Sequence, residues 1–157
     1  MRVEAIQPDI TAASYLNGAQ FIDAYSTLTS DTALTARQAA ERMFSRQPRW
    51  IAGLMAVRDR IVSLFGLKTE QAARSSASNR VGMFPVLDET HNRLVAGLND
   101  RHLDFRVVVD VTEAGQRQRV TATTIVLTHN LLGRVYLAII MPFHRLIVRA
   151  MLRQIAN

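Results

Sequence analysis

The chain has 157 residues, of which 48% are hydrophobic, and this length and composition are typical of one domain with an apolar core of its own. It contains no cysteine, which excludes disulfide bonds, thiolate nucleophiles and cysteine-ligated metal centres. The formal net charge of +6 comes from residues 114–157, which contain arginines and no acidic residue. Clustered arginines occur in nucleic-acid-binding proteins, but a solvated helix face needs no partner, so we do not expect nucleic acid as a ligand.

Residues 1–20 show no clear hydrophobic period and are predicted to form an extended lead-in to a single domain over residues 21–157. Glu4 and Asp9 interrupt this segment where a secretory signal would need a continuous apolar run. The most apolar stretch, residues 135–143, is shorter than the roughly 20 residues that a spanning helix needs. We therefore expect a cytoplasmic protein with no export signal and no transmembrane segment.

The first predicted elements are one strand and two helices. Residues 21–28 are rich in aromatic and β-branched residues and are followed by Thr-Ser-Asp, which is typical of a strand. Thr35 and Gln38 then form a capping-box pattern at the start of a short helix. A second helix is predicted over residues 48–66, which begin with a proline and end with a glycine. Its apolar face consists of Trp50, Leu54, Val57, Ile61 and Phe65.

Four strands and a long helix are predicted for the rest of the chain. The strands cover residues 81–87, 93–99, 102–111 and 119–129, and the helix covers residues 131–155. Short turns make the strands antiparallel neighbours, and the alternation of apolar and polar residues in the third predicts one buried face. The expected fold is α+β. A curved antiparallel sheet of at least five strands surrounds the C-terminal helix, and a two-helix insertion follows strand one.

Two apolar strips follow the C-terminal helix at helical spacing. The strip predicted to pack on the sheet consists of Leu132, Tyr136, Ile139, Phe143, Ile147 and Ala150. The strip on the back consists of Leu137, Met141, Val148, Leu152 and Ile155. Because arginines flank this second strip, as polar residues surround an interface core, we predict a homodimer through the C-terminal helix. An anionic membrane surface, or cover by residues 1–20, would explain the same pattern.

Several separated motifs carry a resemblance to a known family. They are Pro48-Arg49-Trp50, LMAVRDRIVSLFGLK from Leu54, VGMFPV from Val81, NDRHLDFRV from Asn99 and HNLLGRVYLAIIMPFHRLIV from His129. Over roughly residues 20 to 155 the chain resembles the bacterial family called domain of unknown function 2867. That family is placed in the START-like, SRPBCC helix-grip superfamily, so the resemblance implies a helix-grip fold that forms a cup for sterols, lipids or polyketides. It implies no reaction, because the family has no established one.

A helix that crosses a concave sheet predicts a binding site between them for a small apolar ligand. The candidate ligand-binding residues are Trp50, Phe105, Tyr136, Ile139, Phe143 and His144. These side chains would equally serve as ordinary core packing. No phosphate-binding glycine loop and no nucleophile elbow is present, and we expect no cofactor and no metal.

Two groups of residues are candidates for catalysis. His102, Asp104 and Arg106 alternate along one strand, so they could relay a proton from one face. The alternative, which we favour, is a salt-bridge ladder on the outer face, because the apolar residues of this strand claim the concave side. A metal site that adds His129 is not specified by the spacing. His144 either supplies a donor at the pocket edge or is a half-buried residue after the proline kink.

Three functional hypotheses remain open from the sequence. The first is a carrier or sensor of a small apolar ligand such as a lipid, isoprenoid or polyketide. The second is a cyclase or dehydratase in which the same pocket orients an apolar substrate and a histidine moves protons. The third is an interaction module that uses the basic C-terminal helix. The first is favoured because no complete catalytic constellation is visible.

Overall fold

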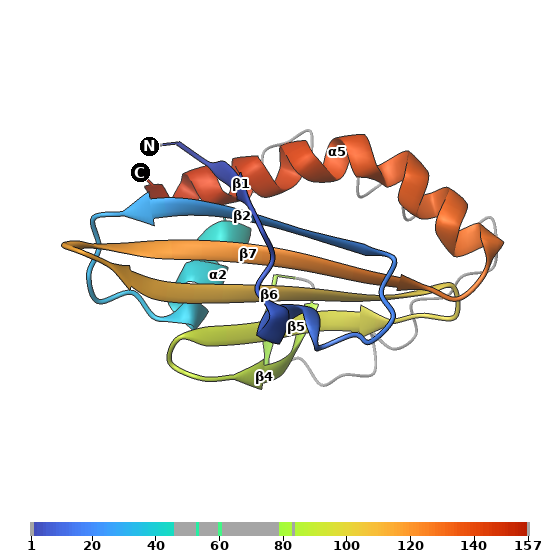
Figure 1. Ribbon diagram of the computed structural model, residues 1–157, viewed down its shortest axis with the longest axis horizontal. Coiled ribbons are helices and arrows are strands. Elements are labelled where there is room, and N and C mark those ends of the chain that lie inside the picture. The colour runs from blue at the N-terminus through green and yellow to red at the C-terminus, as the bar shows by residue number, and fades with distance from the viewer. Residues whose placement is uncertain (1, 46–52, 54–59, 61–78, 83, 157) are drawn as a thin grey trace.

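The computed structural model describes residues 2–45, 53, 60, 79–82 and 84–156 (Figure 1). These residues form a curved antiparallel sheet of seven strands in the order β1-β2-β7-β6-β5-β4-β3, together with a long C-terminal helix. The strands are β1 (Glu4–Ile6), β2 (Phe21–Thr29), β3 (Arg80–Val81), β4 (Phe84–Glu89), β5 (Arg93–Asn99), β6 (Leu103–Ala114) and β7 (Arg117–Thr128). The helices are α1 (Ile10–Ala13), α2 (Ala36–Ser45) and α5 (Leu131–Ala156). The expected fold class is confirmed.

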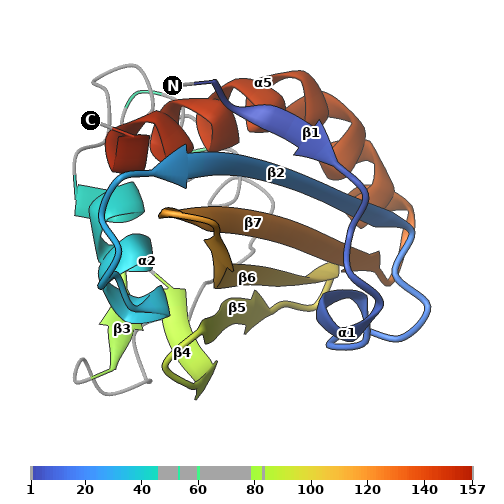
Figure 2. The same ribbon diagram turned by 60° about the vertical axis from the view of Figure 1, so that its left-hand side comes forward.

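Strand alternation divides the sheet into two apolar faces. In β6, Val107 and Val109 belong to the main core, which also contains residues of α2 and α5, whereas Val108 packs with α1. Helices α2 and α5 therefore lie on one side of the sheet and the short helix α1 lies on the other (Figures 1 and 2). We call the side with α2 and α5 the concave face and the side with α1 the convex face.

Helix α2 begins with the capping box that its sequence predicts. The Thr35 backbone N–H donates to Gln38 Oε1 at 3.0 Å, and the Gln38 N–H donates to Thr35 Oγ1 at 3.2 Å. One side of the helix then buries Ala36, Ala39, Ala40 and Met43 against the sheet core. The second predicted helix, over residues 48–66, lies outside the described residues, and so does Trp50.

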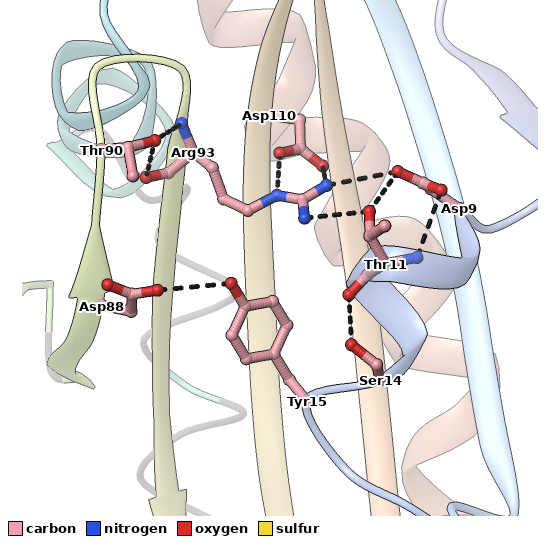
Figure 3. A network of polar contacts seen from close by, with 8 residues as sticks. All are labelled: Asp9, Thr11, Ser14, Tyr15, Asp88, Thr90, Arg93 and Asp110. Atoms are coloured by element: carbon pink, nitrogen blue, oxygen red, sulfur yellow. Dashed lines mark hydrogen bonds and ion pairs between the residues drawn. The ribbon is translucent and has the colours of Figure 1, made fainter.

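Residues 1–20 are not only a lead-in, which corrects the prediction for this segment. Strand β1 pairs with the edge of β2, and α1 packs Ala12 against the convex face. A polar network holds this segment in place (Figure 3). The Arg93 guanidinium forms a bidentate ion pair with the Asp110 carboxylate. It also donates to Thr11 Oγ1 at 3.0 Å and to Asp9 Oδ2 at 3.3 Å. The hydrogen bond and charge of Asp110, followed by the hydrogen bond of Asp9, raise the pKa of Arg93.

Helix α5 runs along the sheet without interruption through Pro142, and its environment changes along its length (Figure 1). In its C-terminal part, residues 147–156, the side chains of Val148, Met151, Leu152 and Ile155 are buried in the main core. In its N-terminal part, residues 131–146, the side chains toward the sheet are only half-buried and those away from it are exposed. By length and composition α5 could cross a membrane, with a mean hydropathy of 1.6, but core helices of soluble proteins also meet this criterion.

The strip assigned to the sheet from the sequence is wrong at Ile139 and Phe143, although Ile147 of the same strip packs against the main core. Val148, Leu152 and Ile155, predicted for the back of the helix, are between 0% and 7% exposed in the core. Ile139 and Phe143, predicted to pack on the sheet, are 62% and 44% exposed. The helix is rotated about its axis relative to the prediction, because apolar residues on nearly all sides left more than one strip able to pack.

Candidate functional site

The candidate site lies on the concave face, where the N-terminal part of α5 passes over β2. Strand β2 begins with alternating side chains, of which Phe21, Asp23 and Tyr25 point toward α5. The alternate residue Ile22 is paired in register with Ile125, which packs on the convex face. Strand periodicity therefore places one carboxylate between two aromatic rings on the surface that faces the helix.

His144 of α5 meets this carboxylate directly. Its Nε2 lies 3.2 Å from Asp23 Oδ1, and the two side chains are 15% and 19% exposed. The Phe21 ring meets the imidazole edge-on, with ring centroids 5.8 Å apart and an interplanar angle of 88°. Asp23 Oδ2 is buried, and no group among the described residues forms a hydrogen bond with it.

This pair can take part in two kinds of chemistry. With Nε2–H donating to Asp23, a neutral imidazole carries its lone pair on Nδ1 and is a hydrogen-bond acceptor or general base there. The carboxylate fixes this tautomer and orients the ring. The unpartnered oxygen of Asp23 is an acceptor without a donor, and a ligand that brings a hydroxyl or N–H group would satisfy it.

The helix itself explains why His144 reaches the sheet. Val148, Met151 and Ile155 follow it at intervals of four, three and four residues, and all three are buried in the core. Residues at these intervals share one helix face. His144 is therefore in the middle of the face toward the sheet. The sequence-based prediction placed it at the flank of a different strip.

An aromatic row continues the concave face away from this pair. Phe44 of α2 contacts Phe84 of β4 with centroids 5.9 Å apart, and Phe84 contacts Phe105 of β6 at 5.1 Å. All three side chains are half-buried and pack against the main core. Phe105, a predicted ligand-binding residue, is therefore on the concave face as expected.

The other predicted ligand-binding residues are separated from one another. Tyr136 is half-buried, Ile139 and Phe143 are exposed on the outer side of α5, and Trp50 is outside the described residues. His144 is the one residue of α5 in this set with a described contact to a β2 side chain. The structure thus brings together His144 and the face that carries Phe105, and it moves Ile139 and Phe143 away from both.

The row of His102, Asp104 and Arg106 divides into separate contacts. Asp104 lies 3.1 Å from Nε2 of His129, while Nδ1 of His102 lies 2.8 Å from the Asn130 amide nitrogen. Arg106 donates to the backbone oxygens of Leu98 and Phe105, and burial lowers its pKa. Arg106 is opposite Ile125 in register, so it is on the convex face. Among the described residues no three histidine and acidic side chains group as metal ligands.

A polar cleft of about 850 Å³ lies on the other side of the sheet, next to the N-terminal segment. Its lining includes Asp9, Arg93 and Asp110 of the network in Figure 3, together with His91 and Glu113. The guanidinium there is already engaged by two carboxylates and a hydroxyl. A ligand in this cleft would have to compete with these contacts for the Arg93 guanidinium.

Comparison with protein families assigns the chain to one family. A family model described as protein of unknown function, DUF2867, matches residues 15–151. The chain belongs to the DUF2867 family. No curated protein and no solved structure matches the chain. The matched range contains Asp23 and His144, and it leaves out β1 and α1 of this DUF2867 chain.

Sequence reasoning identified His144 and missed Asp23. A signal for Asp23 is present in the chain, because it is the one acidic residue in the apolar strand of residues 21–28 and alternates with aromatic residues. A carboxylate on the same strand face as two aromatic rings lowers the stability of the fold when it is buried without a partner. The partner, however, lies 121 residues further along the chain, and no local pattern indicates it.

Proposed function

We propose that this DUF2867 domain binds a small apolar ligand, such as a lipid, an isoprenoid or a polyketide-like molecule, between the sheet and the N-terminal part of α5. The observation that carries the proposal is the change in burial along one side of α5. Val148, Met151, Leu152 and Ile155 are at most 7% exposed. The preceding sheet-facing side chains at Tyr136, Leu137, Ile140, Met141 and His144 are all half-buried.

Incomplete burial on the concave side supports binding because a ligand there would cover apolar side chains that the described residues leave partly exposed. Phe21, Phe84 and Phe105 are half-buried, although each has at least one ring contact on this face. A ligand that covered these rings would remove further apolar surface from water, at about 25 cal/mol per Å². Apolar walls with a few polar groups are also the usual composition of small-molecule sites.

The polar group of the ligand is proposed to meet the His144–Asp23 pair. Asp23 Oδ2 needs a donor, so a ligand hydroxyl fits better than an ether or a bare hydrocarbon. The START-like resemblance of the sequence supports the same kind of ligand, as an argument from fold analogy.

The proposal is tested first on the purified full chain. Native mass spectrometry, followed by solvent extraction, will identify any apolar molecule that co-purifies. Thermal shift and calorimetry with oleic acid, farnesol and 1-naphthol then probe the lipid, isoprenoid and aromatic classes. We expect at least one class to bind and stabilise the fold. Failure of the protein to carry any ligand and to respond to all three probes would refute apolar ligand binding.

A matched ligand pair tests the polar contact. Asp23→Asn and His144→Gln should weaken farnesol binding by about five- to tenfold, since a hydrogen bond contributes about 1 kcal/mol, and should affect farnesyl methyl ether less. His91→Gln, which changes an exposed histidine on the other side of the sheet, is the control. Equal effects on both ligands would remove the hydroxyl contact from the proposal while leaving apolar binding in place.

The second candidate function is proton-transfer catalysis of the cyclase or dehydratase type. The distance of 3.2 Å between His144 and Asp23 favours it, because it is the geometry of an oriented general base. The test is to incubate each bound molecule with the protein and analyse it for cyclisation or loss of water. Conversion that is lost in His144→Ala, with binding retained, would support catalysis. Recovery of every ligand unchanged would favour a carrier.

A further inference from the structure

The outer side of α5 carries an exposed apolar stripe. It consists of Leu131, Val135, Ile139, Phe143 and Leu146, which are 75%, 47%, 62%, 44% and 57% exposed. Their spacing of four and three residues puts them on one helix face. We call this set the outer stripe. Eight large hydrophobic side chains are exposed among the described residues, and five of them belong to the outer stripe. Exposed apolar surface is therefore concentrated on α5.

Positive charge accompanies the outer stripe. Arg134, Arg145, Arg149 and Arg153 are all exposed, and α5 contains no acidic residue. On an ideal helix Arg149 and Arg153 continue the direction of the stripe toward the C-terminus, while Arg134 and Arg145 lie along one side of it. Arg149 also lies over the Tyr25 ring, 5.5 Å from its centroid. An exposed apolar strip beside cationic residues is the composition of a helix that lies in a membrane interface.

We propose that the outer stripe docks on an anionic lipid surface, with α5 parallel to the membrane plane. Apolar side chains would enter the acyl boundary while the arginines contact lipid phosphates. A spanning orientation does not fit, because Val148, Leu152 and Ile155 on the opposite side of the helix are packed in the domain core. Charge decides between a membrane and a second copy of the chain. A symmetric pairing of two α5 helices would juxtapose arginines with no acid on either helix to offset them.

Vesicle flotation with the full chain tests this proposal directly. Vesicles of phosphatidylcholine alone are compared with vesicles of equal parts phosphatidylcholine and phosphatidylglycerol. We expect binding to the anionic vesicles that weakens as salt increases, because the contacts of exposed charges are screened. Ile139→Glu should weaken this binding by at least tenfold, because it removes an inserted side chain and adds a repelled charge. The matched control is Leu87→Glu, which places the same charge at a residue of β4 that is 52% exposed.

The arginine contribution is measured separately. Arg145→Gln and Arg153→Gln should each reduce the affinity for anionic vesicles by about fivefold, as expected for a cation near an anionic surface. All these positions are on the surface, so we expect each variant to keep the fold. Circular dichroism of each variant verifies this.

Four results would overturn the proposal. The first is a wild-type chain that ignores anionic vesicles. The second is equal binding to neutral and anionic vesicles, and the third is equal weakening by Leu87→Glu and Ile139→Glu. The fourth comes from light scattering. A dimer that becomes a folded monomer in Ile139→Glu, without vesicle binding by the wild type, would assign the outer stripe to a second copy of the chain.

Discussion

Two leucine-to-alanine substitutions in one helix test how α5 is seated on the sheet. Leu152 is 0% exposed and lies in the main core with Val148 and Ile155. Its truncation removes buried apolar surface and leaves a cavity, which together cost about 2 to 5 kcal/mol for a buried leucine. Full burial places Leu152→Ala at about 3 kcal/mol or more. For a chain of this size each kcal/mol lowers the melting temperature by about 2 to 4 °C, so the expected shift is roughly 10 °C.

Leu146→Ala is the matched control, because Leu146 is 57% exposed in the same helix. The chemical change is identical, and alanine and leucine are both strong helix formers. We expect its free energy of unfolding to stay within about 0.5 kcal/mol of the wild type. Urea denaturation followed by circular dichroism gives both values. Equal losses, or a larger loss for Leu146→Ala, would show that the assignment of the two helix faces is wrong.

The remaining predictions concern the network of Figure 3 and one close approach of backbones. Arg93→Met should destabilise the fold by about 2 kcal/mol in urea denaturation, because it leaves Asp110 without its cation. Removing one partner of a fully buried ion pair costs about 3 to 5 kcal/mol, and the Asp110 side chain is 14% exposed, so we expect a smaller loss. A change below about 0.5 kcal/mol would contradict this role of the ion pair. Gly133→Ala should lower the melting temperature although alanine favours helices, because its Cβ would lie 2.1 Å from a backbone oxygen in the loop before β6. An unchanged or higher melting temperature would contradict that close approach. The hydrogen bond from Thr11, followed by Arg93, lowers the pKa of Asp9 below its ordinary value. Its contribution to stability is therefore complete above about pH 4 and is lost as pH falls through the lowered pKa. Urea midpoints measured against pH should show a weaker acid dependence in Asp9→Asn, and an unchanged dependence would count against this linkage.

Local patterns were sufficient wherever a short segment decides its own conformation. Strand β5 has the bounds that were predicted, 93–99, because a short continuous apolar run is bordered by turn residues on both sides. The capping box at Thr35 and Gln38 also forms as predicted, since its two hydrogen bonds join residues three apart. The resemblance to the DUF2867 family was likewise carried by continuous motifs and is confirmed.

Local patterns failed for residues 1–20. For the row of His102, Asp104 and Arg106 they favoured the outer face, which agrees with Arg106 on the convex face, but they did not give the contact partners. Strand β1 has only three residues, which is too short to show a period, and it exists because the edge of β2 supplies its hydrogen bonds. The three polar residues alternate on one strand, but the sequence does not say which groups neighbouring strands bring alongside. His129, and not His102, lies against Asp104.

The sequence by itself determined strands β2, β4, β5, β6 and β7, the capped helix and the long C-terminal helix, because hydrophobic period and capping residues act over a few neighbours. It did not determine which side of α5 faces the sheet, since apolar residues occur around most of its circumference and several strips could be buried. Only the tertiary structure selected the side with Val148, Leu152 and Ile155, and this choice placed His144 against Asp23 and left the outer stripe exposed. The physical reason is that the rotation of a helix about its axis depends on the shape of the surface it packs on, which strands distant in the chain create together.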